Sequence, residues 1–477
     1  FEGVSLGLQS MKGVGRLIEV YGLKGDKLSE PKPSEYQDNK VAVHSDDEVP
    51  SIAIIPFRNK GKEADAFYSY GICADLISDC SGAGLIRVAS LKDIENLDYK
   101  TLDTSELASK LFVRYIAHGS LWKMDDMFQL SVELYDTKDK KVVWSDRWQE
   151  KWDNLPTIKM NLSDGLLKAL DTKPKVEKRI ETNNTEAYEF YLKGKYKYGK
   201  RKNKEDMEIA RGLLQKAIEL DDNLIIARTL LGFTYFKMGD YEKTMEIYTS
   251  SLKQAEKLGN KHEIGESLKG ISFAYLIKGD FDKALDYTER SFALSEEIGR
   301  KNEMGQCLQN IGWIYTDKGD YNKALDYYNR GLKIHEELNI KISILNGLAN
   351  LGLVYFYQED YNKAEKYLEK SGAMRLELDD SKITIAIFKV MLEQLSFLFL
   401  SKKILGKEYN AGEIHTLIKK QEYIEYYINF VLFKLLENTS YLETAYNQVQ
   451  EKADNLEPDI AAKFLSYPIP KAIVEEW

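Results

Sequence analysis

The segment GDFDKAL at Gly279–Leu285 is the most informative part of the sequence, because the chain repeats it at a fixed interval. It recurs as GDYNKAL at Gly319–Leu325, as GDYEK at Gly239–Lys243 and as EDYNKA at Glu359–Ala364, so that successive copies are 40 residues apart. A fixed period of this length indicates one supersecondary unit that cannot bury its apolar face alone and stacks on copies of itself. The sequence therefore predicts an all-α superhelix with a long inner face.

Each repeat is consistent with two helices joined by the glycine turn. Before the turn, a small residue and a tyrosine three residues later recur, as at Gly232 and Tyr235. A small residue lets a neighbouring helix approach closely, and an aromatic ring fills the remaining space. This pattern resembles the tetratricopeptide repeat, in the long-period variety of Pins-type scaffolds and kinesin light chains. A divergent copy around Gly194 starts the array near Thr185, and we expect repeats over residues 185–380.

Composition and charge exclude several classes of protein. The 477 residues are enough for two or three domains, and 43% hydrophobic with 30% charged residues is ordinary for a globular chain. We expect no membrane segment, because no apolar run reaches about 18 residues. A net charge of −9 argues against a nucleic-acid partner. Cys73, Cys80 and Cys307 lack disulfide or zinc spacing, which predicts buried thiols in a reducing, cytoplasmic compartment.

The first residues resemble the end of a known enzyme domain. After FEGVSLG at Phe1–Gly7 comes MKGVGRLIEVYGL at Met11–Leu23, in which a glycine turn precedes an alternating strand. This resembles the closing strands of the class III adenylate or guanylate cyclase catalytic domain in bacterial fusion proteins. An unrelated hairpin is the alternative.

The cyclase resemblance implies a parent phosphorus-oxygen lyase that makes cyclic AMP or cyclic GMP with two Mg²⁺ ions. The family's metal-binding aspartates and its transition-state asparagine and arginine lie upstream of these strands. We therefore expect residues 1–23 to be a C-terminal stub, with no catalytic residue, metal or cofactor in this fragment of a longer protein. Because the family's catalytic domains work in pairs, the resemblance also implies a homodimer of the parent.

Residues 24–50 are polar and acidic and predict a linker, whereas residues 51–170 predict a compact α/β domain. The apolar run SIAIIPF at Ser51–Phe57 indicates a buried strand. We expect Asp136–Lys141 to form the loop of a closing hairpin. The other expected elements are helices over 67–81 and 105–111, the second with a serine cap at Ser105, and extended segments over 85–89, 115–120, 128–135 and 142–145.

This α/β unit is similar to the TolB-like amino-terminal domain that lies between bacterial class III cyclases and repeat arrays. The family usually has a glycine where this chain has Phe112, so we expect an altered turn before the strand that follows. The resemblance implies a structural or adaptor domain, and the cyclase stub favours the cytoplasm over a periplasmic TolB-type role. The match rests on Ile52–Phe57, Gly71, Asp75–Ile77, Val113–Tyr115, Gly119–Ser120 and Val143–Trp148.

No group of residues in the sequence has the types and spacing that predict catalysis. Gly82–Gly84 lacks the Gly-Lys-Ser of a phosphate-binding loop and is typical of a helix-ending turn. Asp221–Asp222 and Asp379–Asp380 are expected at helix ends, where capping explains them. The histidines have no second ligand at metal spacing, so we expect no metal site. They are His44, His118, His262, His335 and His415.

The inner face of the repeats is the predicted site of function. In tetratricopeptide arrays the residue after the small position points into a groove, and an apolar ladder there can bind an extended peptide or an amphipathic helix. In this chain the ladder consists of Phe233, Phe273, Trp313 and Leu353. The resemblance also implies that Asn310 and Asn350 clamp the ligand backbone, because a carboxamide donates and accepts at once. The alternative is that the protein's own tail covers the ladder.

Residues 381–477 lose the 40-residue period but remain helical in pattern, which predicts degenerate repeats and a C-terminal cap. Ile383–Leu400 and Ile414–Leu436 are expected to be long apolar helices, and Pro458, Pro468 and Pro470 are expected to end regular structure. The whole sequence predicts a protein-interaction and regulatory region of a class III nucleotide cyclase involved in signal transduction. The alternative assigns the function to the parent cyclase activity itself.

Overall fold

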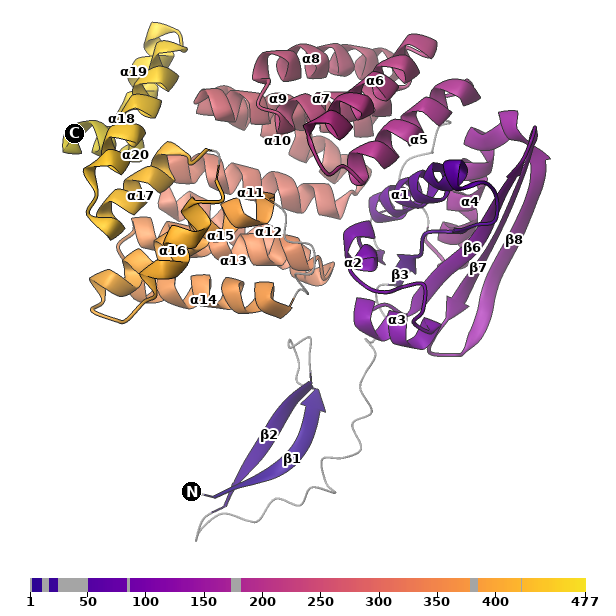
Figure 1. The fold of residues 1–477 in the computed structure, drawn as a ribbon, viewed down its shortest axis with the longest axis horizontal. Coiled ribbons are helices and arrows are strands. Elements are labelled where there is room, and N and C mark those ends of the chain that lie inside the picture. Colours follow the sequence, from indigo (N-terminus) through magenta and orange to yellow (C-terminus); the bar gives the residue numbers. More distant parts are fainter. Residues whose placement is uncertain are drawn as a thin grey trace.

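The computed structural model describes residues 2–10, 17–24, 50–83, 86–172, 182–377, 385–421 and 423–477. These residues form an amino-terminal hairpin, an α/β domain, a helical repeat array and a group of C-terminal helices (Figure 1). In the hairpin, β1 (Glu2–Ser10) pairs antiparallel with β2 (Leu17–Lys24). The predicted linker lies almost entirely outside the described residues.

The α/β domain is built on one mixed sheet with the strand order β5-β3-β6-β7-β8. The first three of these strands are parallel, and β6, β7 and β8 form an antiparallel meander with the expected hairpin loop. The predicted mixed α/β unit is therefore present. The strands are β3 (Ser51–Ile54), β4 (Arg58–Asn59), β5 (Arg87–Val88), β6 (Tyr115–Met124), β7 (Met127–Asp136) and β8 (Lys141–Lys151).

Helices cover both faces of the parallel part of the sheet. Apolar side chains of α1 and α4 join one cluster with the sheet, whereas α2 and α3 pack on the other face around Ala53 and Ile116. The cap of α3 differs from the prediction: Asp103, in extended conformation, accepts the N–H of Glu106 at 2.9 Å, and Ser105 already lies inside the helix. The helices are α1 (Ala66–Gly82), α2 (Leu91–Glu95), α3 (Thr104–Leu111) and α4 (Leu155–Ala169).

The turn before β6 shows what replaces the expected glycine. Phe112 adopts the left-handed conformation, with φ 54°, at the end of α3. A side chain in this region costs about 1–2 kcal/mol, so the turn keeps the geometry that glycine would adopt and carries strain instead. The Phe112 ring lies under the ammonium group of Lys341, 4.3 Å from the ring centroid, and so connects the α/β domain to the repeat array.

Ten helices of the described chain form five consecutive pairs from Thr185 onwards, which we call the repeat array. Figure 1 shows these helices packed one beside the next along the array. The pairs are α5 (Thr185–Gly199) with α6 (Lys204–Leu220), α7 (Ile225–Lys237) with α8 (Tyr241–Leu258), α9 (Lys261–Lys278) with α10 (Phe281–Ile298), α11 (Lys301–Asp317) with α12 (Tyr321–Glu337), and α13 (Lys341–Tyr357) with α14 (Tyr361–Glu377).

The repeated Gly-Asp-x-x-Lys motif forms the turn between the two helices of a pair. Gly279 has φ 93°, a left-handed value that glycine adopts without strain. Asp280 then caps α10 by accepting the N–H of Lys283, and the Lys283 ammonium pairs with the same carboxylate at 3.0 Å. In the decayed copy, Glu359 takes the left-handed position with φ 62°. The motif therefore fixes the turn and starts the second helix.

Tyrosines fill the space inside each pair. Tyr275 of α9 stacks on Tyr287 of α10 with ring centroids 5.6 Å apart, and Tyr315 stacks on Tyr327 at 5.5 Å in the next repeat. Gly312 allows close approach, because a Cβ there would lie 2.8 Å from the ring of Tyr328. The sequence pattern of a small residue followed by a tyrosine is thus a packing pattern.

The described part of the C-terminal segment consists of helices joined by short connections, and it differs from the prediction in two places. The expected helix Ile414–Leu436 is split into α16 and α17. Pro458 and Pro468 begin helices instead of ending them, and Pro470 lies in the first turn of the second helix, because the first turn of a helix needs no N–H from proline. The helices are α15 (Ile385–Ile404), α16 (Ala411–Ile418), α17 (Tyr426–Leu436), α18 (Thr439–Asp454), α19 (Pro458–Ser466) and α20 (Pro468–Glu476).

Two further expectations concern membranes and thiols. Among the described helices, none combines the length and apolar character required to cross a membrane. Cys73, Cys80 and Cys307 are free and buried, as predicted. Burial raises the pKa of the Cys73 thiol to about 12, and its Sγ donates to the carbonyl of Ile55 at 3.3 Å. These thiols are therefore packing groups.

A buried histidine in the array predicts acid sensitivity. His335 on α12 is fully buried against Gly305, and burial lowers its pKa from 6.5 to about 4. The unfolded chain therefore binds the proton more tightly, so the stabilisation is complete above pH 6.5 and is lost as the pH falls towards 4. We expect about 3 kcal/mol of unfolding free energy to depend on this residue. Urea denaturation between pH 7 and 4 should show that the free energy of unfolding declines less steeply for His335→Gln than for wild type or His118→Gln. Equal slopes for the three proteins would contradict the assignment.

Candidate protein-binding face

The first half of the predicted ladder forms an aromatic patch on α7 and α9. Phe233 stacks on Phe236 with centroids 6.4 Å apart, and Phe236 contacts Phe273 at 5.6 Å. Tyr198 from α5 meets the edge of Phe233 at 6.0 Å, and Lys237 lies over the Phe233 ring at 5.0 Å. We call Phe233, Phe236 and Phe273 the aromatic patch. All three are half-buried, and they join none of the apolar clusters that the described residues form with α1 or the C-terminal helices.

The second half of the ladder is covered by the chain's own C-terminal helices. Trp313 is half-buried against a cluster that includes α17, α18 and α19, and Leu353 packs against another formed by α15, α16 and α17. The alternative in which the protein's tail covers the ladder therefore holds for these two residues. A ligand would have to displace the C-terminal helices to reach them.

Buried charged groups lie where the C-terminal helices α17–α20, which we call the cover, pack on the array. Asp317 lies one turn after Trp313, whose indole donates a hydrogen bond to it. Burial raises the Asp317 pKa to about 7, although the indole and the ammonium group of Lys452 on α18 both favour the charged carboxylate. Burial also lowers the pKa of Lys452, which lies 5.3 Å from the ring centroid of Tyr426. The cover thus encloses charged groups as well as apolar ones.

The cover is anchored on the turn of the third helix pair. Phe281, at the start of α10, contacts Phe464 of α19 and Tyr467, with ring centroids 6.4 and 5.0 Å away. A Cβ on Gly279 would lie 3.0 Å from the Phe464 ring, so the repeat glycine also makes room for the cover. An ion pair between Lys463 and Asp282 lies beside these rings.

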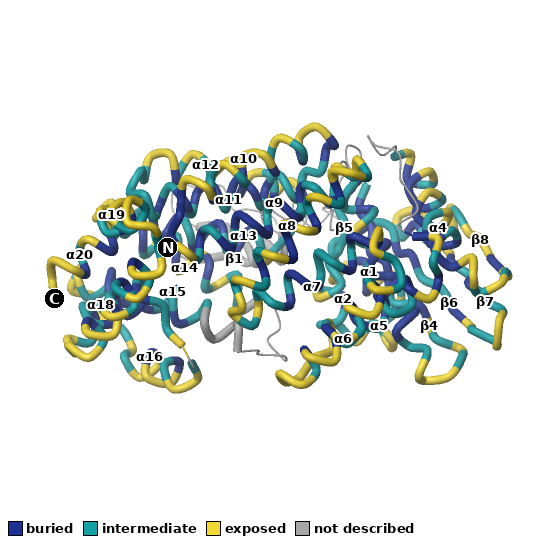
Figure 2. Tube along the Cα trace, turned by 90° about the horizontal axis from the view of Figure 1, so that it is seen from above, coloured by how far each residue is buried: buried dark blue, intermediate teal, exposed yellow. Residues whose placement is uncertain are grey.

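The α/β domain occupies the other end of the array through α1. The Asp75 carboxylate accepts hydrogen bonds from Tyr188 at 2.6 Å and from Tyr191 at 2.9 Å, and it pairs with Lys195, all on α5. One apolar cluster runs from the sheet through α1 and α4 into the first repeats. In Figure 2 the buried parts of α1 and α5 lie side by side. The α/β domain and the array therefore share a core.

Charged side chains on α9 and α11 form an ion-pair network. Glu266 pairs with Lys269 at 2.6 Å, and Arg300 pairs with Glu303 at 2.9 Å and reaches the carbonyl of Ser78 at the end of α1. Although burial raises the pKa of Glu266, Lys269 and His262 outweigh it and lower this pKa to about 2. Burial, with Arg300, lowers the His262 pKa to about 4.

In the described part of the chain, three side chains of the same network have the chemistry to hold a metal ion, although the sequence predicted no metal site. Donor atoms of His262, Glu266 and Glu303 lie within 4.8 Å of one another. The two carboxylates already face Lys269 and Arg300, so they are neutralised without a metal ion. His262 and Glu266 are one helical turn apart, but Glu303 comes from the next helix pair, and no local motif links it to them.

The structure places the predicted site residues in two different parts of the array. Asn310 and Asn350 are half-buried on α11 and α13, in the part of the array that the C-terminal helices approach, whereas Phe233 and Phe273 belong to the aromatic patch. Sequence reasoning missed Phe236 because the residues one and two periods later, Leu276 and Thr316, are not aromatic. The signal in the sequence that could have identified Phe236 is its position one helical turn after Phe233.

Comparisons with known proteins identify the repeats. Family models described as tetratricopeptide repeat match residues 223–297, 263–337 and 345–378. The chain is 22% identical over 237 residues to a putative adenylate cyclase 3 of Rhizobium meliloti (strain 1021). That match covers 48% of this chain and 39% of the relative, so it spans about two-fifths of the relative's length.

Solved structures with similar helical arrays have a lower sequence identity to this chain than that relative has. A Rap protein complexed with competence and sporulation factor is 16% identical, with a TM-score of 0.41 over 66% of this chain and 80% of that one. A putative kinesin light chain of Podosopora anserina with nearly identical TPR-like repeats is 15% identical, with a TM-score of 0.34 over 41% of this chain and 96% of that one. From the family matches and the helix pairs together, residues 223–337 and 345–378 are tetratricopeptide repeats.

Proposed function

We propose that this chain is a protein-interaction scaffold that binds a peptide segment of a partner on the aromatic patch. The observation that carries the proposal is the unequal covering of the ladder. Trp313 and Leu353 pack against clusters that include the chain's own C-terminal helices, whereas the ring contacts described for Phe233 and Phe273 come from α5 and α7. Half-buried aromatic rings on a rigid scaffold are the usual anchors of a protein interface.

The surroundings of the patch suit a peptide with an apolar side chain and an exposed backbone. Phe233, Phe236 and Phe273 offer ring faces and edges to an apolar anchor. The ammonium group of Lys237, on the same helix as Phe233 and Phe236, can pair with acidic groups of the ligand. An extended peptide, or one face of a short helix, could place an apolar side chain against these rings.

Replacing Phe273 with alanine should weaken peptide binding strongly. Peptides would be selected from a random display library on the full chain, and their affinity measured by fluorescence anisotropy. Truncating a central aromatic anchor costs about 2 kcal/mol, roughly a thirtyfold rise in Kd. Ile209→Ala on α6, which is exposed but remote from the patch, is the matched control. Selected peptides that bind Phe273→Ala as tightly as wild type would refute the proposal.

We further propose that the scaffold is the regulatory region of a class III nucleotide cyclase, with a TolB-like α/β domain and a cytoplasmic location. The support is the stub-like sequence Met11–Leu23 and the similarity to a putative adenylate cyclase. In this proposal the catalytic residues and the Mg²⁺ sites belong to the parent and not to this chain, and dimerisation occurs through the parent's cyclase domain. The alternative is that the cyclase activity itself is the function.

A cyclase assay separates these two functions. The full parent protein should convert ATP or GTP with Mg²⁺ to the cyclic nucleotide, and the present chain alone should not. Addition of a peptide selected on the aromatic patch should change the parent's rate. Cyclic nucleotide formation by the present chain would contradict the assignment of all catalytic groups to the parent.

A further inference from the structure

Three side chains on α9 and α11 bring metal-binding donor atoms together. His262 and Glu266 lie one turn apart on α9, and Glu303 lies in the first turn of α11, in the next helix pair. One ligand atom of each residue lies within 4.8 Å of the other two. Donors held about 2.1 Å from one tetrahedral ion lie about 3.4 Å apart, so the side chains have to close a gap of at most about 1.4 Å. Rotation of the two flexible glutamate side chains supplies a movement of this size.

Each of the two carboxylates uses only one oxygen in its ion pair. Lys269 contacts Oε1 of Glu266 at 2.6 Å, and Nε of Arg300 donates to Oε1 of Glu303 at 2.9 Å. In metal sites, the ligating carboxylates are themselves hydrogen-bonded to groups that fix their orientation. The two ion pairs therefore stabilise the carboxylates when no metal ion is bound, and they leave a second oxygen of each carboxylate for an ion.

The second oxygen of Glu303 is enclosed without a partner. The Glu303 side chain is 12% exposed, and no donor among the described residues reaches its Oε2. A buried carboxylate oxygen that lacks a hydrogen bond costs free energy unless an ion or a water molecule completes its surroundings. The His262 side chain is 30% exposed and so gives an ion access from solvent. The carboxylate of Glu263, 3.7 Å from Nε2 of His262, adds a further negative group beside the three ligands.

We propose that His262, Glu266 and Glu303 bind a divalent transition-metal ion such as Zn²⁺. One imidazole with two carboxylates suits Zn²⁺ better than Mg²⁺, which prefers an octahedral shell of oxygen atoms. Three protein ligands leave the fourth position of a tetrahedral ion for water. Because the ligands come from α9 and α11, the ion joins two consecutive helix pairs of the array.

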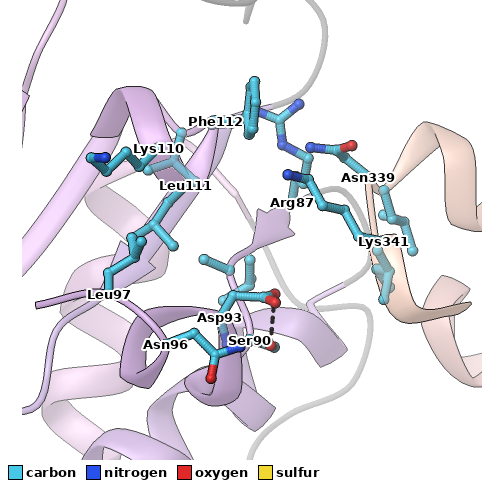
Figure 3. A pocket seen from close by; sticks show the side chains of 15 residues that line it. Arg87, Ser90, Asp93, Asn96, Leu97, Lys110, Leu111, Phe112, Asn339 and Lys341 are labelled. Atoms are coloured by element: carbon cyan, nitrogen blue, oxygen red, sulfur yellow. Dashed lines mark hydrogen bonds between the residues drawn. The ribbon is translucent and has the colours of Figure 1, made fainter. Parts of the chain in front are cut away.

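The site lies beside a contact between the array and the α/β domain. Arg300, which holds Glu303, also donates to the carbonyl of Ser78 near the end of α1 at 3.4 Å. One helix pair further along, Lys341 lies over the ring of Phe112 at the border of a cleft of about 140 Å³ between the two parts (Figure 3). An ion that fixes Glu303 therefore also steadies Arg300 against α1, next to a more open part of the boundary.

Isothermal titration calorimetry on the metal-free full chain tests the site, with ZnCl₂ in one arm and MgCl₂ in the other. We expect one Zn²⁺ ion per chain with a Kd of about 10 µM or below, and Mg²⁺ binding weaker by about a hundredfold or more. His262→Ala and Glu303→Gln should each weaken Zn²⁺ binding by about tenfold or more, because even the loss of a group that orients a ligand has an effect of this size. His415→Ala on α16 and Glu256→Gln on α8, both exposed and outside the group, are the matched controls.

Hydrogen exchange separates this site from adventitious binding to surface side chains. Zn²⁺ should slow exchange at the start of α9 and of α11 in wild type and in both controls, but not in His262→Ala. The proposal is overturned if Zn²⁺ does not saturate the chain up to about 1 mM, or if Mg²⁺ binds as tightly as Zn²⁺. It is equally overturned if His262→Ala and Glu303→Gln, shown to be folded by circular dichroism, bind Zn²⁺ as tightly as the controls.

Discussion

Asp75→Ala is expected to lower the free energy of unfolding by about 3–5 kcal/mol, because it breaks a buried ion pair by removing one partner. Asp75 is 5% exposed and joins α1 to α5 through Tyr188, Tyr191 and Lys195. Its loss leaves one ammonium and two hydroxyl groups at the shared core without their acceptor. Urea denaturation followed by far-ultraviolet circular dichroism measures the change.

The location of the loss distinguishes this contact from an ordinary core defect. Asp75 lies on the boundary between the α/β domain and the array, so Asp75→Ala should also raise hydrogen exchange in α1 and α5 before it does so in α11. Tyr191→Phe removes one hydroxyl and leaves the ion pair intact, and it should cost only about 1 kcal/mol. A change below that value for Asp75→Ala, or uniform exchange along the array, would show that α1 does not hold the two parts together.

Most of the fold that could be predicted from the sequence followed from the repeat period. A 40-residue spacing determines where each turn and each helix pair lies, because every copy faces the same packing problem. Glycine and aspartate then act locally, as a left-handed turn residue and a helix cap, so Gly279 and Asp280 could be interpreted without tertiary information. The same holds for the buried strand at Ser51–Ile54, which is a continuous apolar run.

The covering of the ladder could not be predicted in this way. Whether Trp313 is a ligand anchor or a core residue depends on α17–α19, which lie more than one hundred residues further along the chain and have no period. The sequence left both alternatives open for that reason. Prolines misled the prediction because Pro458 and Pro468 restrict the residue before them in the same way whether they stop a helix or start one. The altered turn expected at Phe112 did not appear, because this residue keeps a left-handed backbone, and its contact with Lys341 is tertiary.

Phe464→Ala should release the C-terminal cover from the array. Phe464 is fully buried and contacts Phe281 and the repeat turn at Gly279. Replacing such a ring with alanine costs about 3–5 kcal/mol, from lost transfer energy and the cavity left behind. Because the cluster that joins α18–α20 to α9–α11 is separate from the one that joins the α/β domain to the first repeats, we expect local detachment and not global unfolding. Hydrogen exchange should then increase in α17–α20 and in the Trp313 segment of α11, while α7 and α8 remain protected.

The consequence for binding connects this variant to the proposed function. Detachment would expose Trp313 beside the aromatic patch and lengthen the apolar ladder from two positions to three, so peptides selected on wild type should bind at least as tightly and longer peptides more tightly. Val474→Ala on α20, where the side chain is 39% exposed, is the control and should change neither exchange nor affinity. If Phe464→Ala increased exchange equally in α7 and α11, the C-terminal helices would be part of one cooperative core and not a separable cover, and the ladder would end at Phe273.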